Sequence, residues 1–452
     1  MITARTYQLL RHRDRARLQA RLRQTQFWSP DRIRRYQFLK LKRMLRHAYR
    51  NVPYYRRMMD DCGAVPADIR NFDDFARLPV LTKSDIRQNV DAMVDARAPA
   101  DRLVANATSG STGQPLRFYQ DERYELWADA ARTRGWYEMA GCRRGDRCAV
   151  LWGAMNDIKT DYSLAERLRD LFLDGEVKLN SGNLSDRRKE AFLRWCRALR
   201  PRLLRGYFTA VKELARYLDQ SGGRFCDLRG IVLCAEMGDE PSREYIERVF
   251  RTRSYNAYGC REVSLIAMEC SCRTGLHEVS ENNYVEFESI DLPGYPGAGN
   301  LIVTNLNNYA MPFVRYRIGD IGVPGSDSVC ECGRGQPRMA KVIGRTTEVF
   351  HFHDGTKIAG EMFIHLMKDL PVDEYQFVQV SDSKVVLRLK RREAADEQLR
   401  EIVLKTFRDY LPCCVPLDFE AVDRFEPTAA GKFRFVFVDP ELANRAGSVG
   451  VT

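Results

Sequence analysis

The pattern of apolar and polar positions divides the chain into three parts, and the first is helical. Residues 1–100 read as helices with short breaks. Between Leu78 and Asp85, a proline turn leads to Thr82, a residue type that caps helices, and Asp85 follows three positions later as its reciprocal partner. We therefore expect residues 1–100 to form a helical region that packs on the body of the protein.

The pattern changes between about residues 100 and 345, where short apolar runs alternate with helical stretches. Strands that alternate with helices indicate a largely parallel sheet with loops gathered at the strand ends. After Tyr284 the pattern turns to β-hairpins. The expected strands are 148–152, 203–207, 231–235, 284–288 and 299–304, and the expected helices are 121–140, 186–199, 209–219 and 241–251.

Residues 346–452 follow a plan of their own, after a junction at 344–347. Their pattern predicts a first strand followed by helices at 360–369 and 394–410 and by strands at 375–380, 384–390, 417–423 and 433–438. The chain is therefore predicted to be an α/β protein. A large N-terminal domain with mixed or parallel sheets and a β-rich subdomain precedes a small α+β C-terminal domain.

Composition supports a folded protein and excludes several other classes. Of 452 residues, 44% are hydrophobic and 29% charged, which excludes disordered, collagen-like and disulfide-scaffold chains. Mean hydropathy is −0.43, and no apolar run approaches the ~18 residues of a spanning helix. The N-terminus lacks a secretory-signal pattern, and thirteen cysteines without such a signal indicate a reducing compartment. We expect a cytoplasmic protein.

The net charge of +11 is concentrated in one segment. Residues 1–50 hold 15 Lys and Arg against Asp14 and Asp31, a balance of +13, so the rest of the chain carries about −2. This distribution argues against specific nucleic-acid recognition by the body of the protein. Two interpretations of the basic arm stay open. It binds an anionic partner, which is anionic lipid at a membrane surface, polyphosphate or nucleic acid, or it is a solvated helix that docks through Leu9, Leu10, Leu18 and Leu22.

The stretch 107–115 concentrates small and hydroxyl residues before a strand-like run. Its glycines are free to take positive φ angles, so successive N–H groups and hydroxyls can point inward as a nest for phosphate oxygens. The Walker A pattern occurs nowhere in the chain. An ordinary surface turn is the alternative. The candidate phosphate-binding residues are Ser109, Gly110, Ser111, Thr112 and Gly113.

Further motifs follow this loop in order: Ala-Tyr-Gly-Cys-Arg-Glu at 257–262, Arg-Tyr-Arg-Ile-Gly-Asp at 315–320, Ile-Gly-Arg at 343–345, and Gly-Lys-Phe-Arg at 431–434. The set resembles the adenylate-forming ligases, the acyl-CoA synthetases and their relatives. Within them it is most similar to the phenylacetate–CoA ligase/CapK branch. The resemblance runs from about Tyr54 to Phe437 and includes the Leu-Pro-Val-Leu-Thr-Lys segment at 78–83.

This resemblance implies activation of a carboxylic acid by ATP with Mg²⁺, in which the carboxylate attacks the α-phosphate and pyrophosphate leaves. Catalysis then consists mostly of positioning and charge neutralisation. The phosphate loop would hold the β- and γ-phosphates. Glu262 would hold Mg²⁺, Asp320 would accept the ribose hydroxyls, Arg345 would lie beside ribose or phosphate, and Lys432 would bridge the carboxylate and the α-phosphate.

The resemblance also places the adenine and the acid. Adenine would lie against Ala235, Glu236 and Met237, beside Gly259, with the Tyr258 ring as a stacking face. Tyr258 is alternatively a core aromatic. The candidate substrate pocket contains Trp152, Tyr207 and Phe208, together with Ala235 and Gly259. Its aromatic residues hint at an aryl or arylacetic acid, although such residues also line cores.

Three positions depart from the family pattern. Gln114 stands where a lysine often ends the phosphate loop, and Thr347 stands at a hinge position that is commonly Asp or Lys. Arg261 replaces a hydroxyl residue before Glu262, so its guanidinium becomes a candidate contact for the α-phosphate. Nucleotide activation remains the expected chemistry. The departures bear on the rate of the reaction and on the geometry of the C-terminal lid in the second half-reaction.

In the family, the C-terminal domain is a mobile lid that withdraws the lysine and admits CoA for attack on the adenylate. No CoA signature is recognisable in 346–452, so the acceptor is CoA, an amine or a protein thiol, with CoA favoured. The alternatives are a CapK-like ligase that passes the adenylate to an amine, and a non-catalytic binding protein on the same fold. A homodimer is also left open.

Two clusters of cysteines remain, Cys270 and Cys272 with His277, and Cys330 with Cys332. Thiolates and an imidazole from two β-rich segments suit a closed tetrahedral Zn²⁺ site. Reduced, unliganded side chains on surface turns are the alternative. By the family pattern we select Cys270, His277, Cys330 and Cys332 as ligands of a structural zinc, with Cys272 as a possible substitute. The zinc would pin the β-rich subdomain around 270–332.

Overall fold

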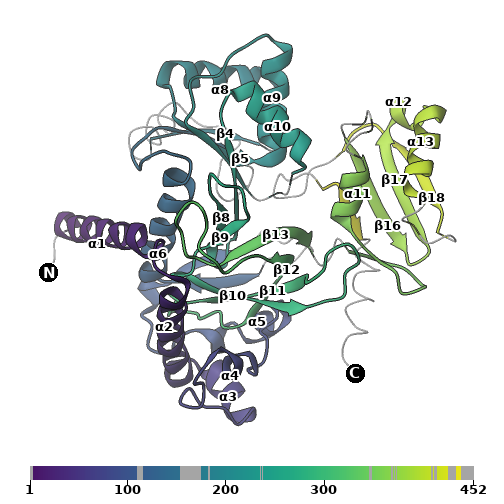
Figure 1. The fold of residues 1–452 in the computed structure, drawn as a ribbon. Helices are drawn as coiled ribbons and strands as arrows, with labels where there is room; N and C mark the ends of the chain where they lie inside the picture. Colours follow the sequence, from purple (N-terminus) through teal and green to yellow (C-terminus); the bar gives the residue numbers. More distant parts are fainter. Residues whose placement is uncertain are drawn as a thin grey trace.

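The fold is the mixed α/β arrangement predicted from the sequence, with a large sheet and a small C-terminal α+β part (Figure 1). The computed structural model describes residues 4–108, 116–152, 175–181, 184–234, 236, 238–345, 349–367, 370, 372, 374–408, 411, 415–425 and 434–438. Among these residues, none of the helices is both long and apolar enough to cross a lipid bilayer.

The large sheet has eleven described strands in the order β10-β11-β12-β13-β9-β8-β7-β6-β5-β3-β4. The strands from β4 to β7 pair in parallel, and those from β7 to β10 pair antiparallel. The predicted β-rich region is therefore continuous with the parallel sheet. The bounds are β3 Cys148–Trp152, β4 Glu176–Asn180, β5 Leu203–Tyr207, β6 Gly230–Cys234, β7 Ser254–Cys260, β8 Ser264–Glu269, β9 Leu276–Glu278, β10 Asn283–Ser289, β11 Gly299–Asn305, β12 Tyr316–Pro324 and β13 Arg338–Arg345.

Helices cover both faces of the parallel strands, because alternate strand residues point to opposite faces. Leu204 and Ile231 pack in one core with residues of α8 (Asp186–Leu199), α9 (Phe208–Gln220) and α10 (Glu240–Phe250). Their neighbours Leu203 and Val232 pack in the opposite core with residues of α6 (Glu122–Arg132) and with Leu22 of α1 (Ala4–Thr25). The fully buried Leu22 and the partly buried Leu18 confirm docking of α1 at these positions. The side chains of Leu9 and Leu10 lie outside the description.

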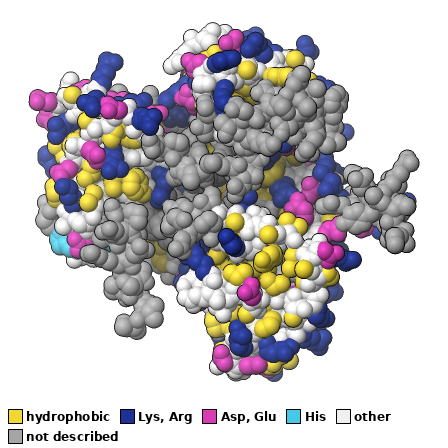
Figure 2. All heavy atoms as spheres, turned by 180° about the vertical axis from the view of Figure 1, so that it is seen from behind, with side chains coloured by type: hydrophobic (Ala, Val, Ile, Leu, Met, Phe, Trp, Pro, Cys, Tyr) yellow, Lys and Arg dark blue, Asp and Glu magenta, His cyan; other side chains and the backbone are white. Residues whose placement is uncertain are grey.

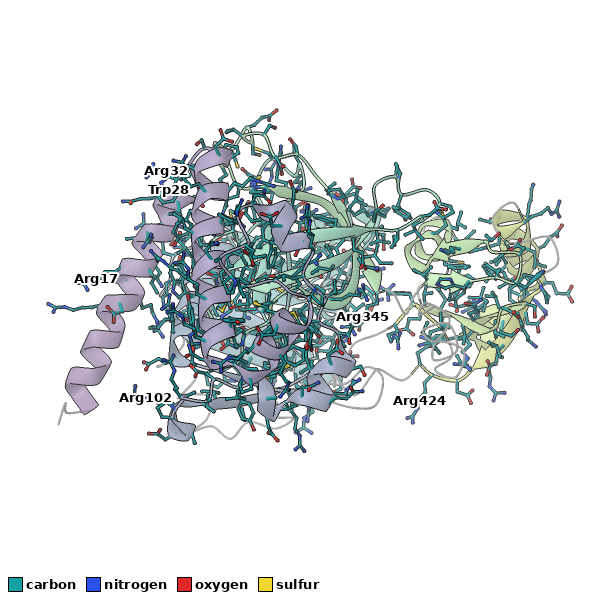
Figure 3. The ribbon with its side chains drawn as sticks, turned by 90° about the horizontal axis from the view of Figure 1, so that it is seen from below. Arg17, Trp28, Arg32, Arg102, Arg345 and Arg424 are labelled. Carbon is teal, nitrogen blue, oxygen red and sulfur yellow. The ribbon has the colours of Figure 1, made fainter. Side chains whose placement is uncertain are left out.

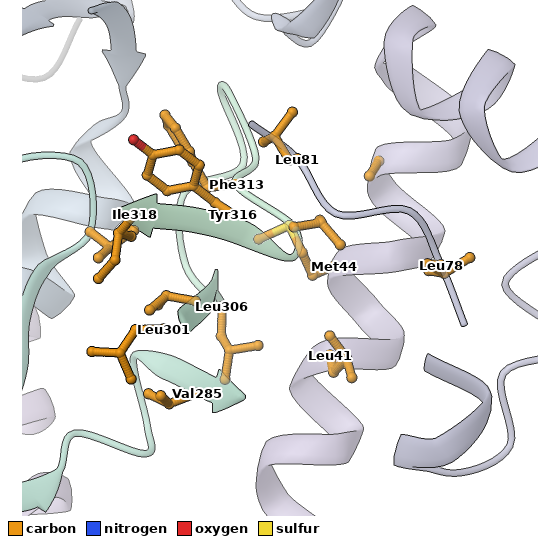
Figure 4. Close-up of a cluster of buried hydrophobic side chains, with 14 of the residues drawn as sticks. Leu41, Met44, Leu78, Leu81, Val285, Leu301, Leu306, Phe313, Tyr316 and Ile318 are labelled. Carbon is orange, nitrogen blue, oxygen red and sulfur yellow. The ribbon is translucent and has the colours of Figure 1, made fainter. Parts of the chain in front are cut away.

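The remaining N-terminal helices pack on the antiparallel strands. Leu41 and Met44 of α2 (Pro30–Asn51) lie in one buried cluster with Tyr316 of β12 (Figure 4). The predicted cap at Thr82 is confirmed as a reciprocal capping box with Asp85. The other elements of this region are α3 Pro53–Asp61, α4 Phe72–Ala76, α5 Lys83–Asn89, the 3₁₀ turns η1 Asp91–Met93 and η2 Ala100–Arg102, and the strand pair β1 Val104–Ala107 and β2 Arg117–Gln120.

A buried ion pair near the start of β10 also anchors the helical region, through Lys40. Arg134 and Glu281 form a bidentate pair at 2.8 and 2.9 Å, and both side chains are 4% exposed. Lys40 donates to the Glu281 carbonyl at 2.6 Å. Arg134 lies in the π-helical turn η3 (Thr133–Glu138), which interrupts the single helix predicted at 121–140. At Gly135 a Cβ atom would lie 2.3 Å from Leu265, so this close approach requires glycine.

The C-terminal part is built around a four-stranded sheet in the order β18-β17-β16-β19. The helix predicted at 394–410 begins later, at Glu397, because Asp396 caps it by accepting from the Leu399 N–H at 3.0 Å, and a separate short helix ends at Ala394. Acidic and basic side chains are interspersed over this part (Figure 2). Its elements are β14 Val349–His351, β15 Lys357–Ala359, α11 Gly360–Met367, β16 Tyr375–Ser381, β17 Lys384–Lys390, α12 Arg391–Ala394, α13 Glu397–Phe407, β18 Leu417–Val422 and β19 Val436–Val438.

Replacement of Glu281 by Gln would leave the Arg134 guanidinium buried without its counter-charge. We expect Glu281→Gln to lower the free energy of unfolding by about 3–5 kcal/mol. The control Glu138→Gln breaks an ion pair with Arg23, which is 54% exposed, and should cost less than ~1 kcal/mol. Urea unfolding followed by tryptophan fluorescence measures both. Equal effects would contradict the importance of the buried pair.

Candidate functional site

The predicted site residues of the parallel strands gather at one edge of the sheet. Trp152 ends β3, Tyr207 ends β5, Glu236 follows β6, and Tyr258 lies near the end of β7. Because these strands are parallel, their carboxyl ends lie at the same edge, where ligands of open α/β sheets bind.

The turn from β7 to β8 holds Glu262, whose side chain is almost fully buried. The Tyr316 hydroxyl of β12 donates to Glu262 Oε1 at 2.9 Å. Gly259 permits the tight pairing that forms the turn, because a Cβ atom there would lie 2.4 Å from the Ser264 carbonyl oxygen. The Glu262 carboxylate therefore projects from the β7–β8 turn and is held by a donor on β12, in the antiparallel half of the sheet.

The base of the Gly/Ser loop lies beside this turn. Thr108 and Leu116 close the loop, with the Thr108 N–H donating to the Leu116 carbonyl and the Leu116 N–H to the Thr108 hydroxyl, both at 3.0 Å. Gln120, at the end of β2, donates to the carbonyls of Arg261 and Glu262 at 3.1 and 3.4 Å. Residues 109–115 themselves, including Ser109, Gly110, Ser111, Thr112, Gly113 and Gln114, lie outside the described residues.

Asp320 joins Tyr258 and Arg345 on neighbouring strands. The Tyr258 hydroxyl donates to Asp320 Oδ2 at 2.7 Å. Asp320 on β12 is the register partner of Arg345 on β13, and Arg345 Nε lies 3.6 Å from Asp320 Oδ1. Arg345 is partly exposed and Asp320 largely buried, so the carboxylate is oriented by an aromatic hydroxyl and a cation.

The electrostatic environment keeps both tyrosines protonated. Burial raises the pKa of Tyr258 well above its ordinary value, and the Asp320 charge raises it further. Burial likewise raises the pKa of Tyr316, with the Glu262 charge acting in the same direction. Protonated phenols donate hydrogen bonds, so the site presents two oriented carboxylates, Glu262 and Asp320, beside two arginines, Arg261 and Arg345.

The candidate substrate-pocket residues lie next to one another, largely within a core. The rings of Trp152 and Tyr207 are 4.7 Å apart, and Phe208 lies against Gly238. Tyr207 and Phe208 are buried, whereas Trp152 is partly exposed.

The Glu236 side chain lies at the N-terminal end of α9. Its Oε2 accepts from the Thr209 N–H and hydroxyl at 2.8 and 2.7 Å, at the helix end where a negative charge is favoured. Ala235, Met237, Thr347 and Lys432 lie outside the described residues.

The predicted metal ligands come together in a separate cluster. Ligand atoms of Cys270, His277, Cys330 and Cys332 all lie within 4.8 Å of one another. Cys270 follows β8, His277 lies in β9, and the other two thiols lie in the connection between β12 and β13. The Cys272 N–H donates to Cys270 Sγ at 3.4 Å, while the Cys272 thiol is not part of the cluster.

The cluster fits a tetrahedral zinc ion in spacing and chemistry. Zinc bonds of ~2.0–2.3 Å place tetrahedral ligand atoms about 3.3–3.8 Å apart. Here Cys270 Sγ and Cys330 Sγ are 3.9 Å apart, and Cys332 Sγ is 3.4 Å from His277 Nε2. Burial lowers the pKa of His277 to about 4, so the imidazole is neutral, as a metal ligand must be.

Two residues of the site were not assigned by sequence reasoning, Tyr316 and Gln120. Tyr316 lies inside the motif 315–320. It shares a strand face with Ile318, two residues later, and this alternation predicts that both side chains are buried, as they are. Gln120 lacked such a signal, because its partners are main-chain carbonyls more than 140 positions away.

Known proteins resemble this chain in sequence and in fold. No family profile matches it. It is 30% identical to phenylacetate-coenzyme A ligase of Escherichia coli K12 over 341 residues, 71% of this chain and 73% of that protein. It is 24% identical to protein CapK of Staphylococcus aureus, over 79% of each chain. Its fold matches 2-hydroxyisobutyryl-CoA ligase in the postadenylation state with a TM-score of 0.68 at 20% identity, over 91% of this chain and 90% of the other.

Removal of the Tyr316 hydroxyl would leave the buried Glu262 carboxylate without this donor. Hydrogen bonds to charged groups contribute about 1.5–3 kcal/mol, and we expect Tyr316→Phe to lower the free energy of unfolding by that amount. Tyr49→Phe removes an exposed bond to Asp60 and serves as the control, with a loss below ~1 kcal/mol. Chemical denaturation measures both. An unchanged free energy of unfolding in Tyr316→Phe would show that this hydrogen bond does not hold the carboxylate.

Proposed function

Because the chain belongs to the phenylacetate–coenzyme A ligase family of AMP-forming ligases, we propose that it activates a carboxylic acid with ATP and transfers the acyl group to CoA. The observation that carries this proposal is the convergence of Glu262, Asp320 and Arg345 with the base of the 109–113 loop at one sheet edge. These are the residue types that a nucleoside triphosphate requires.

Each side chain has a role that its position supports. Asp320, oriented by Tyr258, would accept the ribose hydroxyls, and Arg345 would lie beside the ribose or phosphate. Adenine would lie between the Tyr258 ring and the segment 235–237. Arg261, whose guanidinium is 3.5 Å from Asn106 near the loop base, would neutralise charge on the α-phosphate.

Glu262 would hold Mg²⁺, a hard cation that binds carboxylate oxygens. The bound ion supplies neutralisation of phosphate charge. The contribution of the chain is orientation, since Tyr316 fixes Glu262 Oε1 and both lie in a dry environment. Lys432 would bridge the substrate carboxylate and the α-phosphate as the carboxylate attacks and pyrophosphate departs. The C-terminal part would act as the lid that brings this lysine to the site.

The substrate is proposed to be an aryl or arylacetic acid. Trp152 is the partly exposed aromatic at the end of β3, with its ring tilted against that of Tyr207, and relatives of the chain are named phenylacetate-coenzyme A ligases. An amine acceptor is the second candidate, favoured by the similarity to CapK over 79% of the chain. Consumption of CoA thiol supports the first acceptor, and an amide product supports the second.

We further propose that Cys270, His277, Cys330 and Cys332 hold a structural zinc ion. Four ligands close the coordination sphere, so the ion would cross-link the β8–β9 hairpin to the β12–β13 connection. That connection also contacts the helical region, because Arg334 Nε donates to Gln26 Oε1 at 2.9 Å.

The ligase proposal is tested by trapping the acyl-adenylate with hydroxylamine over a panel of aryl, arylacetic and aliphatic acids with ATP and Mg²⁺. We expect Lys432→Ala to reduce hydroxamate formation about 10²–10³-fold, because it removes one positioned cation. The matched control is Lys405→Ala, an exposed lysine of α13 that should retain full activity. Equal activity of Lys432→Ala and the control would refute the assigned role. Absence of carboxylate-dependent pyrophosphate exchange for every acid would favour a non-catalytic binding protein.

The zinc proposal predicts about one metal ion per chain by mass spectrometry of purified protein. Replacement of Cys330 and Cys332 by Ser should abolish this content and lower the thermal midpoint, since metal binding contributes to folding. Cys62→Ser with Cys226→Ser is the matched control and should keep the metal. Zinc-free wild-type protein, or a double Cys330/Cys332 variant with full zinc content, would contradict the site.

A further inference from the structure

Helix α2 has two faces of opposite character. Its inner face buries Ile33, Gln37, Leu41, Met44 and Ala48 against the sheet. The outer face carries exposed residues that recur every three or four positions and so form one stripe along the helix. The members of this outer stripe are Arg32, Arg35, Leu39, Arg43, Arg46 and Arg50.

Among the residues that the structure describes, three arginines of the outer stripe have no direct partner, although Asp68 and Asp74 lie close enough to this helix to act on the Lys42 charge. Asp31 is the only acid in the α2 sequence, and it lies in the first turn, where the helix dipole favours it. Within the described part of the chain, Arg35, Arg43 and Arg46 make no ion pair, hydrogen bond or ring contact. In the C-terminal part, Arg388 and Arg391 are each paired with a carboxylate, Glu420 and Asp423.

Neighbouring helices extend the same basic surface. Arg21 of α1 lies over the Tyr36 ring at 5.2 Å, and Arg123 of α6 lies over Tyr309 at 4.4 Å. Burial raises the pKa of Tyr36; the Arg21 charge opposes that rise, the Glu281 charge adds to it, and the charges of Arg43 and Arg123 oppose it. Three helices therefore direct positive charge to one region.

Two large apolar side chains in this part of the chain are exposed. Phe27, in the turn between α1 and α2, is 53% exposed, and Leu39, in the middle of the outer stripe, is 54% exposed. The Arg32 guanidinium lies 3.9 Å from the Trp28 ring centre. Arg17, Trp28 and Arg32 lie at the end of the molecule opposite the C-terminal part (Figure 3). This surface is accordingly clear of the candidate site and of the C-terminal part.

We propose that the outer stripe of α2, together with Phe27, docks on an anionic lipid bilayer. A helix that presents arginines with isolated apolar side chains matches a bilayer surface, where phosphates attract the guanidinium groups and the apolar side chains enter the headgroup region. Nucleic acid would use the arginines but leaves Leu39 without a partner. A membrane-bound protein would hold its C-terminal part away from the bilayer, free to move.

The test measures partition of the full-length protein onto vesicles of phosphatidylcholine, with and without about one third phosphatidylglycerol, by co-sedimentation. The wild type should bind the anionic vesicles selectively, and binding should weaken as salt rises from ~0.1 to ~0.5 M. The triple variant Arg35→Gln, Arg43→Gln, Arg46→Gln should bind about 100-fold more weakly, since each arginine contributes roughly fivefold.

A matched triple variant on α8, Arg187→Gln, Arg194→Gln and Arg197→Gln, lowers the net charge equally and should bind as the wild type does. Leu39→Ser should reduce the part of the binding that resists high salt. An equal loss in both triple variants would show that net charge alone acts, and this would overturn the proposal. Failure to bind anionic vesicles would also overturn it, as would preferential binding to a short RNA that competes with the vesicles.

Discussion

The site depends on the hydrogen-bond pairing of strand β7, which is parallel to β6 on one side and antiparallel to β8 on the other. This single strand joins the parallel and the antiparallel halves of one sheet. Its carboxyl end therefore meets the ends of the parallel strands and also turns back toward the antiparallel half. Tyr258 and Glu262 reach β12 from this end, through Asp320 and Tyr316. Gly259 is required at the turn because no side chain fits against Ser264.

The helical region contributes to the site through the backbone of β12. Leu81, just before the cap at Thr82, exchanges main-chain hydrogen bonds of 2.9 Å with Arg315 and Arg317, on either side of Tyr316. Arg315 itself takes a positive φ of 49° and donates to the carbonyls of Ala76 and Leu78. The segment Leu-Pro-Val-Leu-Thr-Lys therefore supports the site, because it fixes the strand that carries both Tyr316 and Asp320. This explains why it occurs together with the other motifs.

The sequence was sufficient for elements whose pattern is local. The strand at 148–152, the helix at 186–199 and the cap at Thr82 are found as predicted. Two helices differ from the prediction in detail. The helix predicted at 121–140 gives way to a π-helical turn at Thr133–Glu138, and the helix predicted at 394–410 starts only after its cap at Asp396, and neither feature changes the apolar periodicity much. The union of parallel and hairpin strands in one sheet depends on pairing between distant segments, which periodicity does not encode. Gln120 was missed because its partners also lie far away in the sequence. The four residues of the cysteine–histidine cluster were selected by the resemblance to the ligase family, and their spacing in the sequence did not select them.

The proposed function depends on binding of a nucleoside triphosphate at the edge formed by β7, β12 and β13. A crystal structure of the protein with Mg²⁺ and a non-hydrolysable ATP analogue tests it most directly. We expect the ribose hydroxyls at the Asp320 carboxylate, adenine against the Tyr258 ring, and the phosphates between Glu262 and the 109–113 loop. A nucleotide bound at another place, with Asp320 still paired only with Tyr258 and Arg345, would contradict it.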